Sequence, residues 1–388
     1  MAEKRYRIFV LGAGFSRPAG LPVAKELWLE ILERARKLDG RAAKFMDDVE
    51  GYLRYRRRCD GAALTPEQMD FEDFLAFLDV EHRLGLRGSD TWSEDGNEGQ
   101  VVVKTLIGRI LTERCPAVNA VPQLYLRFAA LLQPDDIVLT FNYDLLLERA
   151  LEALGKPYRL FSDRYESVGE YGATVDDSRS EVIVLKMHGS IDWFDRAEYR
   201  RHEAVFRQQG VPHPPEHLVF SNVEALGVTP LTDGPRFDND PLRETYRVRD
   251  IDALYAQNLM FRATPRLLSP SSAKLIYHDT MGDFWQGLGG AGLFNFGLAV
   301  IGYSLPDADE YARRVLYGIV SNYQQAHWGG EHFGRVKTPF VMVDRCTEGD
   351  VTHRRLLGRY AFVDWGRAHP LVTSGFDEAA VALLERGA

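Results

Sequence analysis

The sequence predicts an α/β fold with a doubly wound parallel sheet and a large helical insertion. Several short runs of apolar residues each end in polar residues and pass into a stretch with helical periodicity. A glycine-rich turn follows the first of these runs. Strands that are apolar along their whole length are typical of a parallel sheet covered by helices on both faces. Ligands bind such sheets at the carboxyl ends of the strands.

The first predicted strand covers residues 8–11, and the helical pattern after it covers residues 24–38. Between them, Gly12 and Gly14 allow the backbone to turn tightly and to approach a ligand closely. A strand, a glycine turn and a helix N-terminus together form a site for a phosphate or pyrophosphate. A plain connection between a strand and a helix explains the same turn, and the motif alone does not decide between the two.

The other elements follow the same pattern along the chain. The remaining predicted strands are residues 137–140, 182–187, 296–301, 340–343 and 360–363. Two insertions interrupt the sheet: a mostly helical one at 40–132, and one at 195–272 that contains clustered prolines and shows no clear pattern. The sheet is therefore expected to be built from three pieces, which are residues 1–39, 133–194 and 273–388.

The composition is that of an ordinary soluble globular protein, with 45% hydrophobic and 27% charged residues among 388. The formal charge of −9 argues against a dedicated nucleic-acid surface, and the basic run at 54–58 fits a solvated helix face. No long apolar run and no signal-peptide pattern is present, so we expect a cytoplasmic protein without a membrane span. Cys59, Cys115 and Cys346 form no CxxC pair, which agrees with a reducing compartment.

Polar side chains gather where the predicted strands end. The candidates are Ser16, Asn142, Asp144, His188, Ser304 and Asp344. The amide of Asn142 can orient a water or a ribose hydroxyl, and the imidazole of His188 can accept a proton near neutral pH. The Asp344 carboxylate suits ribose hydroxyls, and the Asp144 carboxylate can orient a leaving base or stabilise positive charge on a sugar. With a pyrophosphate at the glycine turn, these groups match the cleavage of an N-glycosidic bond in a dinucleotide.

Each candidate also has a simpler structural explanation. A histidine before Gly-Ser at the end of a strand is often a satisfied loop residue. Asn142 and Asp144 stand at a junction between a strand and a helix, where Asn and Asp cap helix N-termini. Ser304 before Leu-Pro fits ordinary turn chemistry. The functional interpretation depends on all of these residues falling at strand ends of one sheet.

Four short motifs resemble those of the sirtuin family, in the family's order. Residues 12–22 are similar to the nucleotide-binding signature GAGxSxxxGIP, and residues 140–144 to TQNID. Residues 186–190 resemble the strand end that carries the catalytic histidine, and residues 302–305 resemble the GTSL segment near the cofactor phosphates and ribose. With the strand-end argument, this resemblance implies a Rossmann-like NAD-binding fold. The implied NAD-binding residues are Gly12, Ala13, Gly14, Phe15, Ser16, Leu21, Pro22, Gly302, Ser304 and Asp344, and the implied catalytic residues are Asn142, His188 and Asp144.

The sequence departs from the sirtuin deacylases at three places. Val23-Ala24-Lys25 stands where the deacylases carry Asp-Phe-Arg, and Phe141 stands in place of the glutamine of TQNID. No cysteine lies between Cys115 and Cys346, so the two CxxC pairs of the deacylase zinc ribbon are missing, and we expect no metal. These departures argue against the acyl-lysine groove that is built on the ribbon.

The chain instead resembles the sirtuin-like domains of bacterial anti-phage defence systems, through FNYD at 141–144, GYSLP at 302–306 with Asp309 nearby, and the helical insertion. This resemblance implies an NAD hydrolase of abortive-infection defence that releases nicotinamide and ADP-ribose, with Asn142 and His188 as the catalytic pair. It implies control by homo-oligomerisation or by a partner such as a translocase-type ATPase, with nucleic acid acting only indirectly. Two alternatives remain, an NAD-dependent protein deacylase and a sensor that binds NAD or ADP-ribose without cleaving it.

Overall fold

The chain forms two compact units, each described below by itself. Unit 1 comprises Met1–Leu21, Cys115–His188 and Met281–Ala388, and unit 2 comprises Pro22–Arg114 and Gly189–Thr280. The computed structural model describes residues 6–86, 96–211, 217–268, 282, 284–285, 287–307, 309–326, 328–329 and 336–386. The domain limits expected from the sequence remain a prediction.

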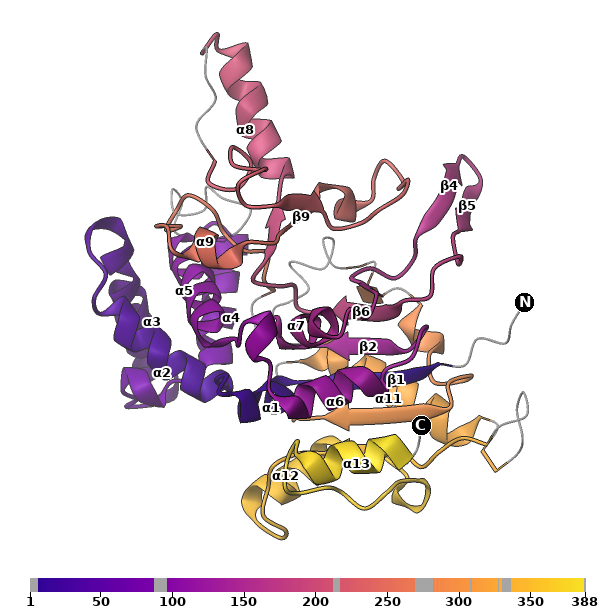
Figure 1. The fold of residues 1–388 in the computed structure, drawn as a ribbon. Coiled ribbons are helices and arrows are strands. Elements are labelled where there is room, and N and C mark those ends of the chain that lie inside the picture. The colour runs from indigo at the N-terminus through magenta and orange to yellow at the C-terminus, as the bar shows by residue number, and fades with distance from the viewer. Residues whose placement is uncertain are drawn as a thin grey trace. The chain divides into compact units, whose positions relative to one another are not determined.

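Unit 1 is built on a six-stranded parallel sheet with the strand order β11-β10-β1-β2-β6-β3 (Figure 1). The strands are β1 (Arg7–Leu11), β2 (Ile137–Thr140), β3 (Tyr158–Arg159), β6 (Val182–Lys186), β10 (Gly297–Ile301) and β11 (Val341–Val343). From β1 the chain adds β2 and β6 on one side, and then returns to add β10 and β11 on the other. This is the doubly wound, Rossmann-like arrangement, so the predicted fold class is confirmed.

The strand register brings the carboxyl ends of the central strands into one row. Leu11 at the end of β1 lies opposite Thr140 of β2 and Ile301 of β10. Thr140 in turn lies opposite Lys186, the last residue of β6. The segments that follow these four strands therefore leave the sheet at the same edge, and the strand order reverses at this edge beside β1.

Helices flank the sheet of unit 1. They are α1 (Ala13–Ser16), α6 (Gln123–Leu131), α7 (Leu146–Ala153), α11 (Glu310–Gln325), α12 (Val351–Arg359) and α13 (Glu378–Arg386). The ring of Phe15 packs against those of Tyr125, Phe128 and Phe376, with centroids 4.7–5.2 Å apart. This aromatic cluster joins the turn after β1 to α6 and to the segment before α13.

The strand predicted at 360–363 is wrong. Tyr360 is the C-cap of α12, and a turn follows it. Its hydroxyl donates a hydrogen bond to the carbonyl oxygen of Tyr303 at 2.7 Å, which holds the ring in the core. The apolar character of this run therefore reflects the burial of a helix end rather than a strand.

Unit 2 combines a helical part with a small antiparallel sheet. The helices are α2 (Ala24–Ala35), α3 (Phe45–Asp60), α4 (Phe71–Arg83), α5 (Glu98–Arg114), α8 (Ala197–Gln208) and α9 (Ile251–Tyr255). The sheet has the order β7-β9-β8, from β7 (Trp193–Asp195), β9 (Thr245–Val248) and β8 (Val228–Pro230). Tyr255 links the two parts, because its hydroxyl donates to the carbonyl of Ile191 at 2.8 Å and its ring lies against Gly108 of α5.

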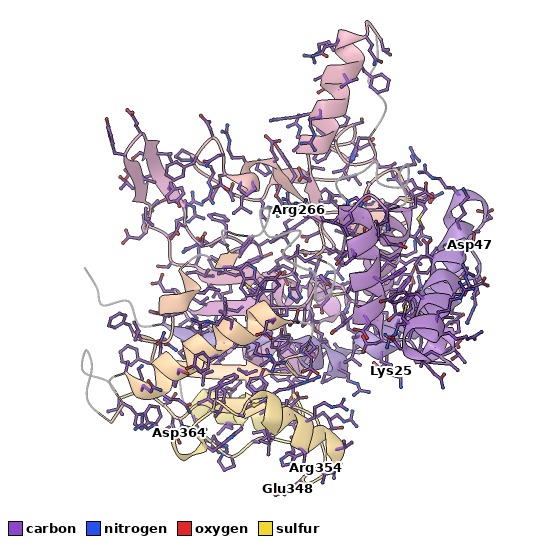
Figure 2. All side chains as sticks on the ribbon, turned by 180° about the vertical axis from the view of Figure 1, so that it is seen from behind. Lys25, Asp47, Arg266, Glu348, Arg354 and Asp364 are labelled. Atoms are coloured by element: carbon purple, nitrogen blue, oxygen red, sulfur yellow. The ribbon has the colours of Figure 1, made fainter. Side chains whose placement is uncertain are left out.

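The outer faces of the helices carry charged side chains, such as those of Lys25, Asp47 and Arg354 (Figure 2). None of the helices in the described ranges has the length and apolar composition that crossing a bilayer requires.

Lys337 is a buried lysine whose titration should be visible in the stability of the protein. Its Nζ donates to the carbonyl oxygens of Gly292 at 3.0 Å and Tyr323 at 3.2 Å, and burial lowers the pKa of Lys337 to about 8. The folded protein thus holds this proton less tightly than the unfolded chain does. We therefore expect the free energy of unfolding to rise between about pH 8 and pH 10 as the penalty for the buried charge disappears.

In Lys337→Met, the increase in the free energy of unfolding that Lys337 contributes over this pH range should be missing, since methionine has no group that titrates. Urea unfolding of both proteins at the two pH values measures the difference. The same pH dependence in the variant would show that Lys337 is not the group responsible.

Candidate active site at the carboxyl ends of the strands

The glycine turn after β1 packs directly against the loop after β10. The N–H of Gly12 donates to the carbonyl of Ile301 at 3.0 Å, and the N–H of Gly14 donates to that of Gly302 at 2.9 Å. A Cβ on Gly12 would lie 2.5 Å from the Gly302 carbonyl oxygen, and one on Gly14 would lie 2.7 Å from the Gly302 Cα. Glycine is therefore required at both positions so that the two loops can touch.

These hydrogen bonds change the role expected for the turn. The N–H groups of Gly12 and Gly14 already have partners, and the N–H of Phe15 donates to the carbonyl of Gly12 at 2.9 Å. The turn thus offers fewer N–H groups to a pyrophosphate than the sequence motif predicts. Ala13 is exposed on the turn, whereas the ring of Phe15 lies in the aromatic cluster of the core.

Asn142 connects the end of β2 to the glycine turn. Its Nδ2 donates to the carbonyl oxygen of Gly12 at 3.0 Å and to Oγ of Ser16 at 3.1 Å. A carbonyl can only accept, so the contact with Gly12 fixes which side of the amide carries the nitrogen. Within the described ranges, Oδ1 of Asn142 accepts no hydrogen bond. This oxygen can accept one from a water molecule or a sugar hydroxyl.

His188 is the second residue after β6, which ends at Lys186, and it faces a buried carboxylate. The side chain is 6% exposed, and its Nε2 lies 3.7 Å from Oδ1 of Asp309, which is equally buried. Oδ2 of Asp309 accepts a hydrogen bond from the Tyr303 hydroxyl at 2.8 Å. The carboxylate is thus held where it can stabilise a protonated imidazole.

Asp309 is absent from the set of predicted site residues. In the sequence, Asp309 was noted only beside the GYSLP motif of the resemblance, at the start of the helix that follows the strand predicted at 296–301. Asp309 is the N-cap residue of α11, but its side chain does not cap the helix. It is therefore available for the contacts with His188 and Tyr303.

Aromatic rings surround His188. The ring of Phe141 stacks on that of Tyr303 with centroids 4.1 Å apart, and its centroid lies 5.0 Å from that of His188 in an edge-on arrangement. The rings of Tyr143 and Trp285 lie 6.2 Å from those of His188 and Phe141, respectively. Phe141, the residue that replaces glutamine in the sirtuin-like motif, thus holds Tyr303 and the imidazole in place.

The contacts of Asp144 agree with a structural role. Its Oδ1 accepts the N–H of Leu146 at 3.0 Å in the first turn of α7. Its carbonyl oxygen accepts a hydrogen bond from Lys186, which is fully buried and pairs with Glu148 at 2.7 Å. These contacts hold the chain just before α7, whose N-cap is Leu145, and a part of Asp144 in catalysis stays a prediction.

The other predicted binding residues are spread over several loops of unit 1, and one of them lies at the start of unit 2. Ser16 is buried under Asn142, and Ser304 is exposed after β10. Asp344 follows β11, and burial raises the pKa of its carboxyl group. Leu21 is buried in unit 1, whereas Pro22 is the first residue of unit 2.

No group of three or more His, Cys, Asp or Glu side chains is arranged to hold a metal ion in the ranges that the structure describes. Burial raises the pKa of the Cys115 thiol to about 12. At neutral pH a thiol with such a pKa is protonated and therefore a poor nucleophile.

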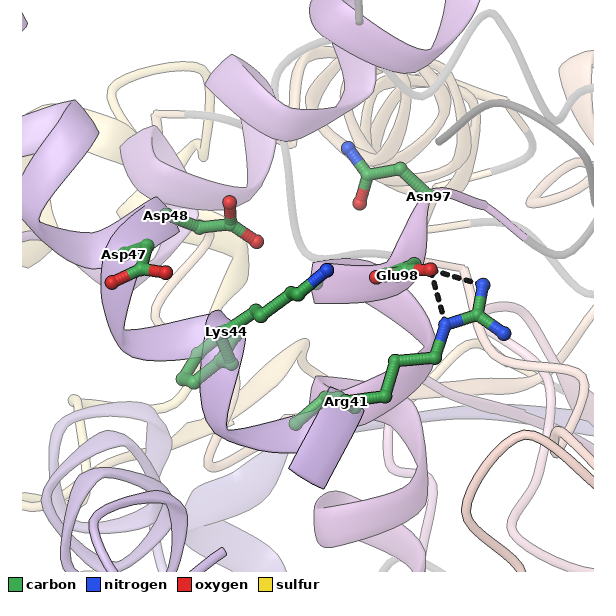
Figure 3. Close-up of a pocket in the computed structure, with 9 residues that line it drawn as sticks. Arg41, Lys44, Asp47, Asp48, Asn97 and Glu98 are labelled. Carbon is green, nitrogen blue, oxygen red and sulfur yellow. Dashed lines mark hydrogen bonds and ion pairs between the residues drawn. The ribbon is translucent and has the colours of Figure 1, made fainter. Parts of the chain in front are cut away.

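Unit 2 contains a separate polar cavity of about 190 Å³ (Figure 3). Arg41 pairs with Glu98 at its wall, and the buried side chain of Asp48 packs against Gly99. The lining residues carry both signs of charge, and none of the predicted site residues is among them. We assign this cavity no role in the proposed chemistry.

Residues 136–220 match the family model of the SIR2-like domain. This range contains β2, β6, Asn142 and His188, so the expected resemblance to sirtuin-like domains is confirmed for this part of the chain. No curated protein matches the chain.

Solved structures of sirtuins are similar to the chain at low identity. Sir2Tm bound to a propionylated peptide is 12% identical, with a TM-score of 0.31, and the match covers 99% of this chain and 92% of that one. A Sir2 complex with a p53 peptide and NAD+ is 13% identical, with a TM-score of 0.32 and coverage of 99% and 94%. Because these TM-scores lie below 0.5, no residue is assigned a role from them.

Proposed function

We propose that the protein hydrolyses NAD+ at the bond between nicotinamide and ribose, and releases nicotinamide and ADP-ribose. One observation carries this proposal. Asn142 and His188 follow neighbouring strands at the carboxyl edge of the sheet. The glycine turn orients Asn142, and Asp309 faces His188. Doubly wound sheets bind their ligands at this edge. The SIR2-like match over residues 136–220 supports NAD as the ligand.

In the proposed reaction, a water attacks the anomeric carbon while the bond to nicotinamide breaks and positive charge builds on the ribose. Oδ1 of Asn142 accepts a hydrogen bond from this water and orients it. His188 accepts the proton that the water loses, or one from a ribose hydroxyl, and Asp309 stabilises the resulting imidazolium. The nicotinamide nitrogen keeps the bonding electron pair, so the products are nicotinamide, ADP-ribose and one proton.

The rest of the substrate is assigned to the loops around this pair. In the proposal, Ser16, Ser304 and the glycine turn hold the phosphates, and Ser16 and the N–H groups of the turn exchange their present hydrogen bonds for bonds to the phosphates. Asp344 accepts hydrogen bonds from the hydroxyls of a ribose. Unrestrained hydrolysis would deplete NAD in a cell, so the activity needs control. We propose an effector of antiviral abortive infection in the cytoplasm that a homo-oligomer or a partner such as a translocase-type ATPase activates.

The proposal is tested by incubating the full chain with NAD+ and measuring nicotinamide by chromatography. The assay is run with the protein alone, with the protein encoded by the neighbouring gene, and with an acetyl-lysine peptide. Release without the peptide supports hydrolysis, and release only with the peptide indicates a deacylase. NAD+ binding without any release indicates a sensor and contradicts the proposal, as does the absence of both.

Asp309→Asn should lower kcat for NAD hydrolysis by about 10–100-fold, which corresponds to about one to two pKa units of lost stabilisation of the imidazolium. Asparagine has the size of aspartate and can still accept the hydrogen bond from Tyr303. Without the negative charge, the pKa of His188 should fall, so the acidic limb of the pH profile of kcat/KM should move to lower pH. Steady-state kinetics across pH measures both effects.

Asp307→Asn is the matched control, since Asp307 is exposed and pairs with Arg313 and Arg359. This variant should retain the kinetics of the unmodified protein. An unchanged pH profile in Asp309→Asn would separate Asp309 from the proton transfer.

A further inference from the structure

The end of α12 holds the loop that follows β10. The hydroxyl of Tyr360 donates a hydrogen bond to the carbonyl oxygen of Tyr303 at 2.7 Å, and Nη1 of Arg359 donates to that of Ser304 at 3.3 Å. The next residue, Leu305, has a φ of +50°, which is uncommon for a residue with a side chain. Two consecutive residues at the end of α12 thus fix the position of Ser304, to which the proposed function assigns a phosphate.

The guanidinium group of Arg359 has donors that no described acceptor uses. Its Nε and Nη2 donate to the two carboxylate oxygens of Asp307 at 3.2 and 3.1 Å, and Nη1 donates to the carbonyl of Ser304. A guanidinium group carries five N–H donors, so one on each of Nη1 and Nη2 is left without an acceptor in the ranges that the structure describes. The side chain is 18% exposed. A mostly buried cation with unused donors therefore lies beside Ser304, and such a cation suits the oxygen atoms of a phosphate.

The carboxylates near Arg359 lie in the solvent. Asp307 is 78% exposed and also pairs with Arg313 at 3.0 Å, and Glu310, which is equally exposed, pairs with Arg313 at 3.3 Å. The formal charges of these four groups cancel. Water screens the two exposed carboxylates more strongly than the guanidinium group of Arg359, which is the least exposed of the four. A phosphate at the free donors is therefore attracted by Arg359 more than the carboxylates repel it.

The residues assigned to the phosphates supply no positive charge of their own. Ser16 and Ser304 are neutral, and the N–H groups of the glycine turn have to give up their present partners before they can bind an anion. Each phosphate of a dinucleotide carries a negative charge, which is costly to bury without a cation. Arg17 and Arg345 also stand beside predicted site residues, but both side chains are exposed. Arg359 contacts Ser304 itself, so it is placed to neutralise a phosphate there.

We infer that Arg359 binds the diphosphate group of the substrate through its two free N–H groups, and that the site thereby selects nucleotides that carry a diphosphate. The assignment rests on the proposed function for the position of NAD+, but it does not require that NAD+ is hydrolysed. Asp307 keeps its bonds to Nε and Nη2 and does not have to move. An asparagine at 307 can accept a hydrogen bond from Arg359 as well, so Asp307→Asn remains suitable as a control.

The test measures binding of ADP-ribose and of adenosine to the full chain by isothermal titration calorimetry. ADP-ribose carries a diphosphate but no nicotinamide, so it reports binding without hydrolysis, and adenosine carries no phosphate. Arg359→Gln should weaken binding of ADP-ribose by about tenfold or more and leave that of adenosine unchanged. Added salt should weaken ADP-ribose binding to the unmodified protein more than to this variant, and Arg359→Lys, which keeps the charge, should restore part of the affinity.

Arg354→Gln is the matched control, because Arg354 lies on the same helix and donates to the carbonyl of Gly349 at 2.9 Å. It removes the same charge and should leave the affinity for ADP-ribose unchanged. The inference would be overturned if Arg359→Gln bound ADP-ribose as tightly as the unmodified protein does, or lost affinity for both ligands to the same extent. A failure of the unmodified protein to bind ADP-ribose would overturn it as well.

Nicotinamide release from NAD+ by the same preparations separates the role of Arg359 from the proposed function. Binding of ADP-ribose that depends on Arg359, without any release, would uphold this role and refute the hydrolase. Release together with ADP-ribose binding that is insensitive to Arg359→Gln would uphold the hydrolase and overturn the role. Where NAD+ is cleaved, Arg359→Gln should raise KM and leave kcat little changed.

Discussion

Replacement of His188 by alanine is expected to lower kcat for NAD hydrolysis by about 10²–10⁴-fold, the range that a positioned general base contributes. The imidazole is buried between Phe141 and Asp309, so alanine leaves no proton acceptor at this position. In the proposed mechanism the ring moves a proton and does not bind the substrate. The loss should therefore fall on kcat, with KM little changed. Nicotinamide release at saturating NAD+ measures it.

His369→Ala is the matched control, because His369 lines a cavity with Arg7 and Gly297, at the amino ends of β1 and β10. It should keep the turnover of the unmodified protein. Asn142→Ala should lose turnover as well, and also about 1–3 kcal/mol of stability, because it removes hydrogen bonds to Gly12 and Ser16. Unmodified turnover in both His188→Ala and Asn142→Ala would refute the assigned roles even if the chain hydrolyses NAD.

The sequence predicts the central strands well because each is a short, continuous apolar run with a polar end. The strand expected at 137–140 has the same limits as β2, and the one at 296–301 differs from β10 by one residue. The strands of unit 2 were missed for a physical reason. β7 and β8 have three residues each, too few to show an alternation of apolar and polar positions. Their pairing with β9 depends on tertiary contacts that no local pattern reports.

The candidate site could be predicted only in part. Local patterns placed Asn142 and His188 at strand ends, and the parallel register puts those ends at one edge. The resemblance named Asp309 beside GYSLP but gave it no role, because what distinguishes Asp309 from its acidic neighbours Asp307 and Glu310 is a hydrogen bond from Tyr303. The sequence likewise attributed the glycines of the turn to a tight bend and the close approach of a ligand, whereas the surface that they touch in the structure belongs to the loop after β10.

Gly302→Ala is expected to destabilise the protein by about 3 kcal/mol or more, from overpacking together with backbone strain. Gly302 has a φ of +64°, and a Cβ on it would lie 2.3 Å from the backbone nitrogen of Phe15 and 2.4 Å from the carbonyl carbon of Gly14. Neither atom can move aside without breaking the hydrogen bond from Gly14 to Gly302. The same movement would pull the glycine turn away from Asn142, so NAD turnover should fall together with stability.

Gly20→Ala is the matched control, because Gly20 also has a positive φ, of +89°, but no atom lies within 4 Å of an added Cβ. This variant should carry only the cost of an L-residue in the left-handed region, about 1 kcal/mol. The difference between the two variants in calorimetric unfolding midpoint therefore isolates the contact between the two loops. Nicotinamide release from the same preparations reports whether that contact also positions Asn142. Equal destabilisation by the two substitutions, with turnover intact, would mean that the loops separate at little cost and that Asn142 is oriented by other contacts.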